Sequence, residues 1–317
     1  MKHRFLLGLD AGSSGVHCLL ADADDRRSVS SFQAWFHPVD RNADVWGFQF
    51  DTVYNWRILA RAVQDVIERA GAKPSEVIGL AAAGMRFGLV VLDKKGREIF
   101  ATPNRDARAA SQSSELAREH GTDIQRLSGH WPGPIFAAPR LRWLSARQPD
   151  LLKRADKVLN VSDWVAFRLC GEAVMDHSQA SETLLADLGT SDWASDMIDA
   201  FDLPRDIFLR VRPPGTHLGA LTREAASELG LKAGTPVAVG GADTQCSLLG
   251  GGVISHGQVG IVAGTTVPIQ LVLDTPLIDA TAHLWTGRHV IDKAWVLESN
   301  AGAMGEALEW ISEALFS

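Results

Sequence analysis

The sequence predicts a mixed α/β fold, and three observations support this prediction. Two apolar runs are joined by a short Gly/Ser-rich turn within residues 6–22, which is the pattern of two strands and a tight turn. An amphipathic helix follows from Phe50 to Ala70, with Asp51 at its start and Gly71 at its stop. Further short apolar runs do not alternate strictly with helices, which indicates a mixed sheet rather than a parallel one.

Composition sets the class of protein. The chain has 317 residues, a length that suggests two domains of usual size, or one domain and a large piece of another. Of these residues 46% are apolar, which is ample for a sizeable core. Its net charge is −7 and it has no block of Lys and Arg, so a nucleic-acid partner is not expected. No apolar run approaches the ~18 residues of a membrane span, and no signal-peptide pattern follows the start. Three widely spaced cysteines, Cys18, Cys170 and Cys246, predict reduced thiols and a cytoplasmic location.

The turn after the first strand is the first candidate site. Gly12 and Gly15 permit a close approach of the backbone to a ligand, and turn N–H groups together with the hydroxyls of Ser13 and Ser14 can bind an anion. Asp10 ends the strand beside this turn. A carboxylate next to a phosphate is repelled unless a divalent cation lies between them, so Asp10 predicts Mg²⁺. An ordinary hairpin with a flexible tip is the alternative for this stretch alone.

The remaining elements follow in order along the chain. Strands are predicted at residues 28–36, 77–83, 90–93, 98–101, 157–161, 237–240, 258–263 and 267–273. Helices are predicted after residue 108 up to about residue 120, and over residues 139–147, 162–169 and 303–316.

A second candidate site begins where the strand at 237–240 runs into a helix. Asp243 stands at this junction among small neighbours that leave room for a ligand. A carboxylate held near a substrate hydroxyl can act as its general base. Asp is also favoured at a helix N-cap, so this simpler role stays open. The polar stretch from Pro103 to Arg108 directly follows another strand and is either part of a site or a solvated loop.

The turn Gly264-Thr265-Thr266 repeats the opening design of strand, small hydroxyl-bearing turn and strand. Two such turns, far apart in the sequence, can hold neighbouring phosphates from opposite sides of a cleft. The repeat is more specific than either turn alone.

Taken together, these motifs resemble the FGGY family of carbohydrate kinases, in the superfamily of actin and hexokinase. They stand in the family's order at residues 8–14, 84–88, 104–108, 162–172, 176–181, 188–193, 240–245 and 264–266. Within the family, residues 46–56, 85–86, 104–108 and 135–144 look most like the autoinducer-2 kinase branch, and the xylulose kinases are the other branch considered.

The resemblance implies a ribonuclease H-like fold, a mixed five-stranded sheet flanked by helices as in actin-like ATPases. It places an N-terminal domain at residues 1–248 and the start of a second, similar domain at residues 249–317. The family's adenosine-binding segment lies further on than residue 317, so the sequence is expected to be either a fragment or a shortened paralogue.

The resemblance also implies ATP-dependent phosphoryl transfer, with Mg²⁺, to a hydroxyl of a small sugar or polyol. Asp243 is then the catalytic base and Asp10 the residue that orients the metal. The implied nucleotide-binding residues are Asp10, Gly12, Ser13, Ser14, Gly264, Thr265 and Thr266. The implied substrate contacts are Met85, Arg86, Asp106, Asp163 and Asp243.

Some positions depart from the family pattern. Ala242 stands where the family has a glycine next to the base, and Arg140 where it usually has Lys. The alternative hypothesis is therefore a truncated, catalytically inactive sugar-binding or regulatory paralogue. A Rossmann dehydrogenase is excluded because the opening turn lacks Gly-x-Gly-x-x-Gly and runs into a strand. The apolar face of the helix at 303–316 has no partner in the sequence, which makes a homodimer one expectation.

Overall fold

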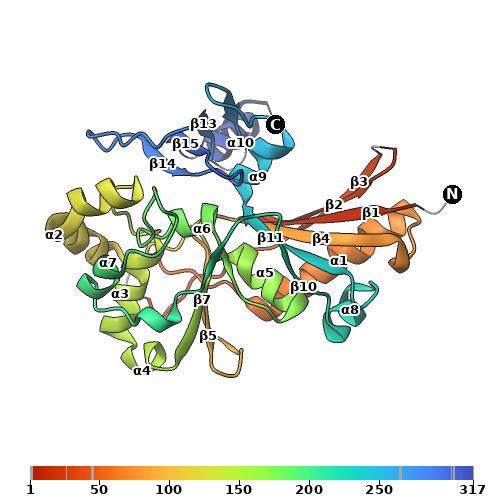
Figure 1. The fold of residues 1–317 in the computed structure, drawn as a ribbon, viewed down its shortest axis with the longest axis horizontal. Coiled ribbons are helices and arrows are strands. Elements are labelled where there is room, and N and C mark those ends of the chain that lie inside the picture. The colour runs from red at the N-terminus through yellow and green to blue at the C-terminus, as the bar shows by residue number, and fades with distance from the viewer. Residues whose placement is uncertain are drawn as a thin grey trace.

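The computed structural model of the chain describes residues 3–25, 27–43, 46–263, 266–300, 302 and 304–316. A larger unit is built on a six-stranded sheet and a smaller one on a four-stranded sheet (Figure 1). The strands of the large sheet lie in the order β10-β11-β4-β1-β2-β3. Their bounds are β1 Phe5–Ala11, β2 Gly15–Asp22, β3 Ser28–Ala34, β4 Val77–Gly84, β10 His217–Ala220 and β11 Pro236–Ala242.

The pairing of these strands is mixed, as the sequence predicts. The first three strands form an antiparallel meander, whereas β4 runs parallel to β1, and β11 runs parallel to β4. These five strands make the five-stranded arrangement that the family resemblance implies. The sheet has six strands rather than five because the short strand β10 pairs antiparallel with the edge strand β11.

The register brings three strand ends together. Ala11 at the end of β1 lies opposite Gly84 at the end of β4, and Ala242 at the end of β11 lies opposite Gly84 from the other side. Because the three strands are parallel, the segments that follow them all leave the same edge of the sheet. Ligand sites of open α/β sheets form at this edge.

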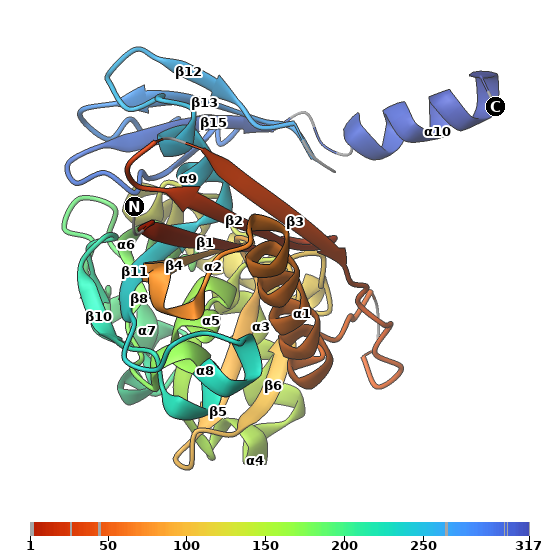
Figure 2. The ribbon, with the colours of Figure 1, turned by 90° about the vertical axis from the view of Figure 1, so that its right-hand side faces the viewer.

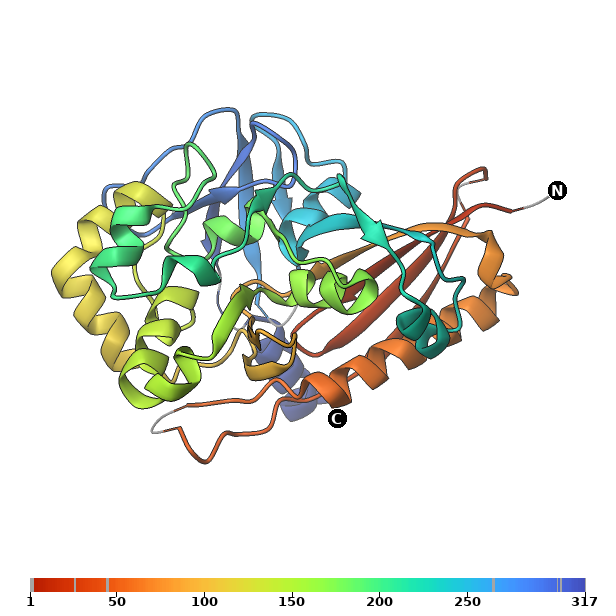
Figure 3. The same cartoon turned by 60° about the horizontal axis from the view of Figure 1, so that its bottom comes forward.

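The two faces of the large sheet differ. Leu7, Leu9 and Ala11 of β1 are buried, whereas Leu6 is exposed and Asp10 shares its face, because side chains of a strand alternate. Two helices cover the buried face, α1 (Thr52–Ala70) and α5 (Val161–Cys170), and α8 (Arg223–Leu229) packs against both of them. Figure 3 shows α1, in orange, lying along the red strands. The four-stranded sheet lies over the other face (Figure 2), so Asp10 points toward the smaller unit.

Helix α1 shows that local sequence signals set its ends. The carboxylate of Asp51 accepts a hydrogen bond from the backbone N–H of Tyr54, and Gly71 ends the helix with a φ of 61°. Both predicted ends are confirmed.

A second hydrophobic cluster lies beside the large sheet. Its strands and helices are β5 Leu89–Asp93, β6 Glu98–Thr102, β7 Ala155–Leu159, α2 Ala110–Ser128, α3 Ala137–Arg147, α4 Pro149–Leu152 and α7 Ser195–Ala200. The short helix α6 (His177–Ser181) contributes Ala180 to the main cluster instead. The short strands β8 (Met175–Asp176) and β9 (Val211–Arg212) pair with each other.

Helix α9 (Asp243–Gly250) leads into the smaller unit, whose sheet has the order β12-β13-β15-β14. Its strands are β12 Val259–Ile261, β13 Pro268–Leu273, β14 Trp285–Arg288 and β15 Trp295–Asn300. The last helix, α10 (Met304–Phe316), extends away from both sheets (Figure 2) and exposes Leu308, Trp310 and Phe316. In the part of the chain that the structure describes, no helix has the length and apolar character needed to cross a membrane.

Candidate active site

A cavity of about 480 Å³ opens between the two units, at the carboxyl ends of β1, β4 and β11. Both units contribute to its walls. Seven of the residues predicted from the sequence line it: Asp10, Gly12, Ser13, Ser14, Arg86, Asp243 and Thr266. The structure therefore brings together the opening turn, Arg86 two residues after β4, Asp243 directly after β11, and Thr266 of the second turn.

The opening turn is held by hydrogen bonds on two sides. Gly12 N–H donates to the carbonyl oxygen of Gly15 at 2.9 Å, and the indole N–H of Trp35 donates to the carbonyl oxygen of Gly12 at 3.0 Å. The hydroxyl of Ser13 donates to the side-chain oxygen of Asn104 at 3.0 Å. The polar stretch after β6 thus contacts the opening turn through Asn104. No pattern in the sequence had indicated that Trp35 would bind this turn. These bonds fix the backbone N–H groups of the turn before a ligand arrives.

Asp10 and Asp243 are two carboxylates of the same cavity. Burial, and secondarily the charge of Asp243, raises the pKa of Asp10 to about 7. One oxygen of Asp10, Oδ1, is buried without a hydrogen-bond partner. Burial also raises the pKa of Asp243, although the positive charge of Arg86 opposes this effect. The two carboxylates therefore destabilise each other's ionised form.

The predicted N-cap role of Asp243 is wrong. The N-cap of α9 is Ala242, and Asp243 is the first residue within the helix. Its Oδ1 accepts hydrogen bonds from the backbone N–H of Thr244 at 2.7 Å and from the hydroxyl of Thr244 at 3.1 Å. The side chain therefore stays at the cavity wall and does not turn back over the helix start.

The two carboxylates are suited to a divalent cation. A cation near the unpartnered Oδ1 of Asp10 would satisfy that oxygen and relieve the repulsion from Asp243. Within the described residues, no group of three or more His, Cys, Asp or Glu side chains is arranged to hold a metal ion. Mg²⁺ does not need such a group, because it commonly binds one or two carboxylates and completes its shell with water and phosphate oxygens.

Arg86 lines the cavity, but its guanidinium is already paired. It donates to both oxygens of Glu298, at 2.6 and 2.8 Å, and to Glu182 at 3.3 Å. Burial alone would lower the pKa of Arg86, yet the two carboxylates raise it. Glu298 and Glu182 were not identified from the sequence, because neither stands in a motif that carried the resemblance.

Three predicted substrate contacts lie outside the lining of the cavity. Met85 is fully buried in the core. Asp106 is fully buried and accepts hydrogen bonds from the side chain of Arg108. Asp163 belongs to a capping box at the start of α5, where it accepts the backbone N–H of Asn160 at 3.1 Å. The carboxylates of Asp106 and Asp163 thus already bind protein groups, and the role of all three residues as substrate contacts stays a prediction.

Part of the second predicted turn cannot be placed. Gly264 and Thr265 lie outside the described residues. Thr266, Val262 and Ala263 line the cavity. That the second turn lies at the cavity is therefore inferred from Val262, Ala263 and Thr266, the described residues on either side of it.

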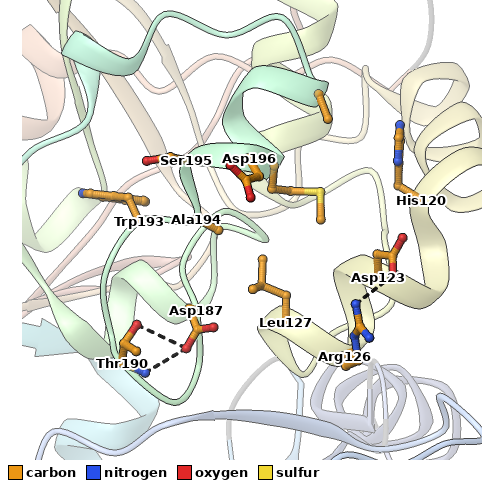
Figure 4. Close-up of a pocket in the computed structure, with 12 residues that line it drawn as sticks. His120, Asp123, Arg126, Leu127, Asp187, Thr190, Trp193, Ala194, Ser195 and Asp196 are labelled. Carbon is orange, nitrogen blue, oxygen red and sulfur yellow. Dashed lines mark hydrogen bonds and ion pairs between the residues drawn. The ribbon is translucent and has the colours of Figure 1, made fainter.

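A second, larger pocket of about 830 Å³ lies between α2 on one side and α7 with the segment before it on the other (Figure 4). Its polar groups bind one another: Arg126 pairs with Asp123 at 3.1 Å, and Asp187 accepts the N–H of Thr190 at 2.8 Å. None of the predicted catalytic, nucleotide-binding or substrate-binding residues lines it. Its size alone therefore does not make it the candidate active site.

Comparisons with known proteins agree with this arrangement. A family model described as the FGGY family of carbohydrate kinases, N-terminal domain, matches residues 5–250. An autoinducer-2 kinase of Yersinia enterocolitica is 34% identical over 316 residues, which cover 98% of this chain and 59% of that protein. The chain thus spans about three fifths of the length of the curated relatives it matches.

Solved structures show the same fold. A xylulose kinase from Rhodospirillum rubrum superposes with a TM-score of 0.86 at 24% identity, over 98% of this chain and 63% of that one. A gluconate kinase from Lactobacillus acidophilus superposes with a TM-score of 0.88 at 20% identity, over 99% of this chain and 63% of that one.

Proposed function

Because this chain belongs to the FGGY family of carbohydrate kinases, we propose that it takes part in ATP-dependent transfer of the γ-phosphate to a hydroxyl of a small sugar or polyol. One observation carries this proposal. Asp10, the turn from Gly12 to Ser14, Asp243 and Thr266 line a single cavity although they come from distant parts of the chain.

Asp243 is the proposed general base. It must be ionised to accept the proton of the acceptor hydroxyl, and burial works against ionisation. The positive charge of Arg86 and the hydrogen bonds from Thr244 favour the ionised form. The base is therefore held in one position with its charge partly compensated, which suits proton transfer in the transition state.

The opening turn is the proposed phosphate site. Its N–H groups and the hydroxyl of Ser14 line the cavity close to Asp10. Asp10, with its unpartnered oxygen, is the residue that would hold Mg²⁺. When bound, Mg²⁺ neutralises the charge on the phosphate oxygens. The protein's own contribution is to position phosphate and hydroxyl and to keep the turn rigid through Trp35.

The acceptor is proposed to be a small polyhydroxy compound. The identity with autoinducer-2 kinases favours a compound like autoinducer-2, and the fold is shared with xylulose and gluconate kinases. A panel of pentuloses, polyols and the autoinducer-2 precursor covers these choices.

The test compares Asp243→Asn with the parent in the intact protein, in an assay of ADP release with Mg²⁺ and the acceptor panel. We expect a loss of roughly 10²–10⁴-fold in kcat, the usual contribution of a general base, with acceptor binding retained in calorimetry. Asp150→Asn is the matched control, because the Asp150 side chain is 94% exposed and remote from the cavity. Full activity of Asp243→Asn would show that Asp243 is not the general base. Acceptor binding by the parent without any transfer would instead support the inactive sugar-binding paralogue.

A further inference from the structure

Around Arg86 lies a buried polar cluster that the proposed mechanism does not use. Resting on the proposed kinase function, we propose that Glu298 occupies the Arg86 guanidinium and thereby restricts the acceptor to uncharged polyols and sugars, against sugar acids. Glu298 is then a specificity-determining residue, and the steps below give the reasons.

Arg86 is the group at this end of the cavity that would otherwise bind a carboxylate. A guanidinium presents a planar fork that fits a carboxylate with two hydrogen bonds. In this protein both bonds of the fork go to Glu298, at 2.6 and 2.8 Å, and Glu182 takes a third at 3.3 Å. Arg86 is 7% exposed, so a carboxylate on the acceptor would have to displace Glu298 to reach it.

Glu298 is itself held in place. Its carboxylate also accepts a hydrogen bond from the side-chain amide of Gln270 at 2.7 Å. Gln270 lies on β13 and Glu298 on the adjacent strand β15, where the two residues are register partners. Both are buried in the smaller unit. The ion pair with Arg86 therefore joins the smaller unit to the larger one, and the geometry of Glu298 is set by its own sheet.

Glu182 is fixed in a similar way from the larger unit. It accepts a hydrogen bond from the side-chain amide of Gln245 at 3.1 Å and lies 3.2 Å from Nε2 of His130. Burial would raise the pKa of Glu182, but Arg86 and His130 outweigh it and lower the pKa to about 2. Glu182 therefore stays ionised at neutral pH.

The charges near the acceptor hydroxyl are consequently negative in sum. Four carboxylates, Asp10, Asp243, Glu182 and Glu298, lie in or beside the cavity, against the two guanidinium groups of Arg86 and Arg105; Glu182 and Glu298 contact Arg86 directly. The hydroxyls of a neutral polyol can donate hydrogen bonds to such groups. A carboxylate on the acceptor would be repelled, and at the low effective dielectric of a buried site this repulsion exceeds about tenfold in affinity.

The experiment uses matched acceptors in the intact protein: pentitols and pentuloses against the corresponding pentonates, which differ by a carboxylate. The readout is the ratio of kcat/KM for neutral over acidic acceptors. We expect the parent to favour neutral acceptors by about tenfold or more. Glu298→Gln should lower this ratio by about tenfold, mainly through KM for the acid, because it leaves Arg86 with an uncharged partner. Glu298→Asp, which keeps the charge, should retain most of the preference.

A double variant separates specificity from a general structural effect. Adding Arg86→Met to Glu298→Gln removes the group that would bind the acid, so the gain on pentonates should disappear. A parent that prefers pentonates overturns the inference, whatever the variants do. So does an unchanged ratio in a folded Glu298→Gln. If Glu298→Gln does not fold, a Glu298→Asp ratio equal to that of the parent supports the inference and a lost preference overturns it. No transfer to any acceptor would overturn the proposed kinase function itself.

Discussion

Replacing Asp10 by Asn should stabilise the ligand-free protein while it removes the proposed metal ligand. The carboxylate of Asp10 is buried, has an unpartnered oxygen and faces the charge of Asp243. Without a cation, its ionisation costs free energy that an amide does not cost. The site is thus arranged for a ligand and not for the stability of the empty protein.

The magnitude follows from the shifted pKa. Asp10 has a pKa of about 7 against an ordinary value of 3.8, a difference of about three units. At about 1.4 kcal/mol per unit, ionisation lowers the free energy of unfolding by about 4 kcal/mol. Below about pH 4, Asp10 is protonated in both the folded and the unfolded chain and the penalty is absent; the penalty grows as the pH rises from about 4 to about 7 and is constant above that. Because water in the open cavity screens part of this charge, we expect Asp10→Asn to be about 2–4 kcal/mol more stable at pH 8.

The assay is a series of thermal or denaturant unfolding curves from pH 4 to pH 8, in EDTA and without nucleotide. The stability gap between Asp10→Asn and the parent should be near zero at pH 4 and grow toward pH 8. Asp93→Asn is a control of opposite sign. Hydrogen bonds from Arg97 lower the pKa of Asp93 to about 2, so its replacement should destabilise the protein at neutral pH and have less effect as the pH falls. A gap for Asp10→Asn that is absent at pH 8, or is independent of pH, would refute the reasoning.

Two further predictions concern the backbone around the site. Gly240→Ala should prevent folding or cost several kcal/mol, because its Cβ would overlap the carbonyl oxygen of Ala82, whereas Gly250→Ala, with no atom within 4 Å, should leave the melting temperature unchanged or slightly raised. Trp35→Phe removes the hydrogen bond to the carbonyl of Gly12, which is worth about 1 kcal/mol, and should weaken ADP binding in calorimetry about fivefold with little change in acceptor affinity. A stable Gly240→Ala, or unchanged ADP affinity in Trp35→Phe, would contradict the respective argument.

Local sequence patterns predicted those elements correctly whose bounds depend only on the residues of one short segment. The ends of α1 follow from Asp51 and Gly71, and the strand before Asp243 follows from its apolar run. Helix α2 shows the limit of this approach. Gly121 suggests a stop, yet the helix continues to Ser128, because Gly121 packs against the ring of Trp131 and leaves no room for a Cβ. At Gly121, the glycine is needed for the contact with Trp131 and does not mark the end of the helix.

The same limit applies to the site. Asp10 and Asp243 stand at strand ends and were each a candidate from their own short motif, but only the family resemblance predicted that they share one site. Asp106 and Asp163 stand in equally suggestive motifs, but each carboxylate binds protein groups, and only the tertiary contacts show this. Glu298 lies in a strand without a motif, and its importance depends on Arg86, which is 212 residues away in the sequence.

The two walls of the cavity are far apart in the sequence, so they are synthesised at different times. Asp10 is made early, whereas Asn300, which lines the same cavity, follows 290 residues later. At about 5–20 residues per second, a ribosome needs roughly 15–60 s to cover this interval. Throughout that time the nascent protein has Asp10 and the opening turn without the opposing wall, so any binding that needs both walls of the cavity must wait until Asn300 has been made.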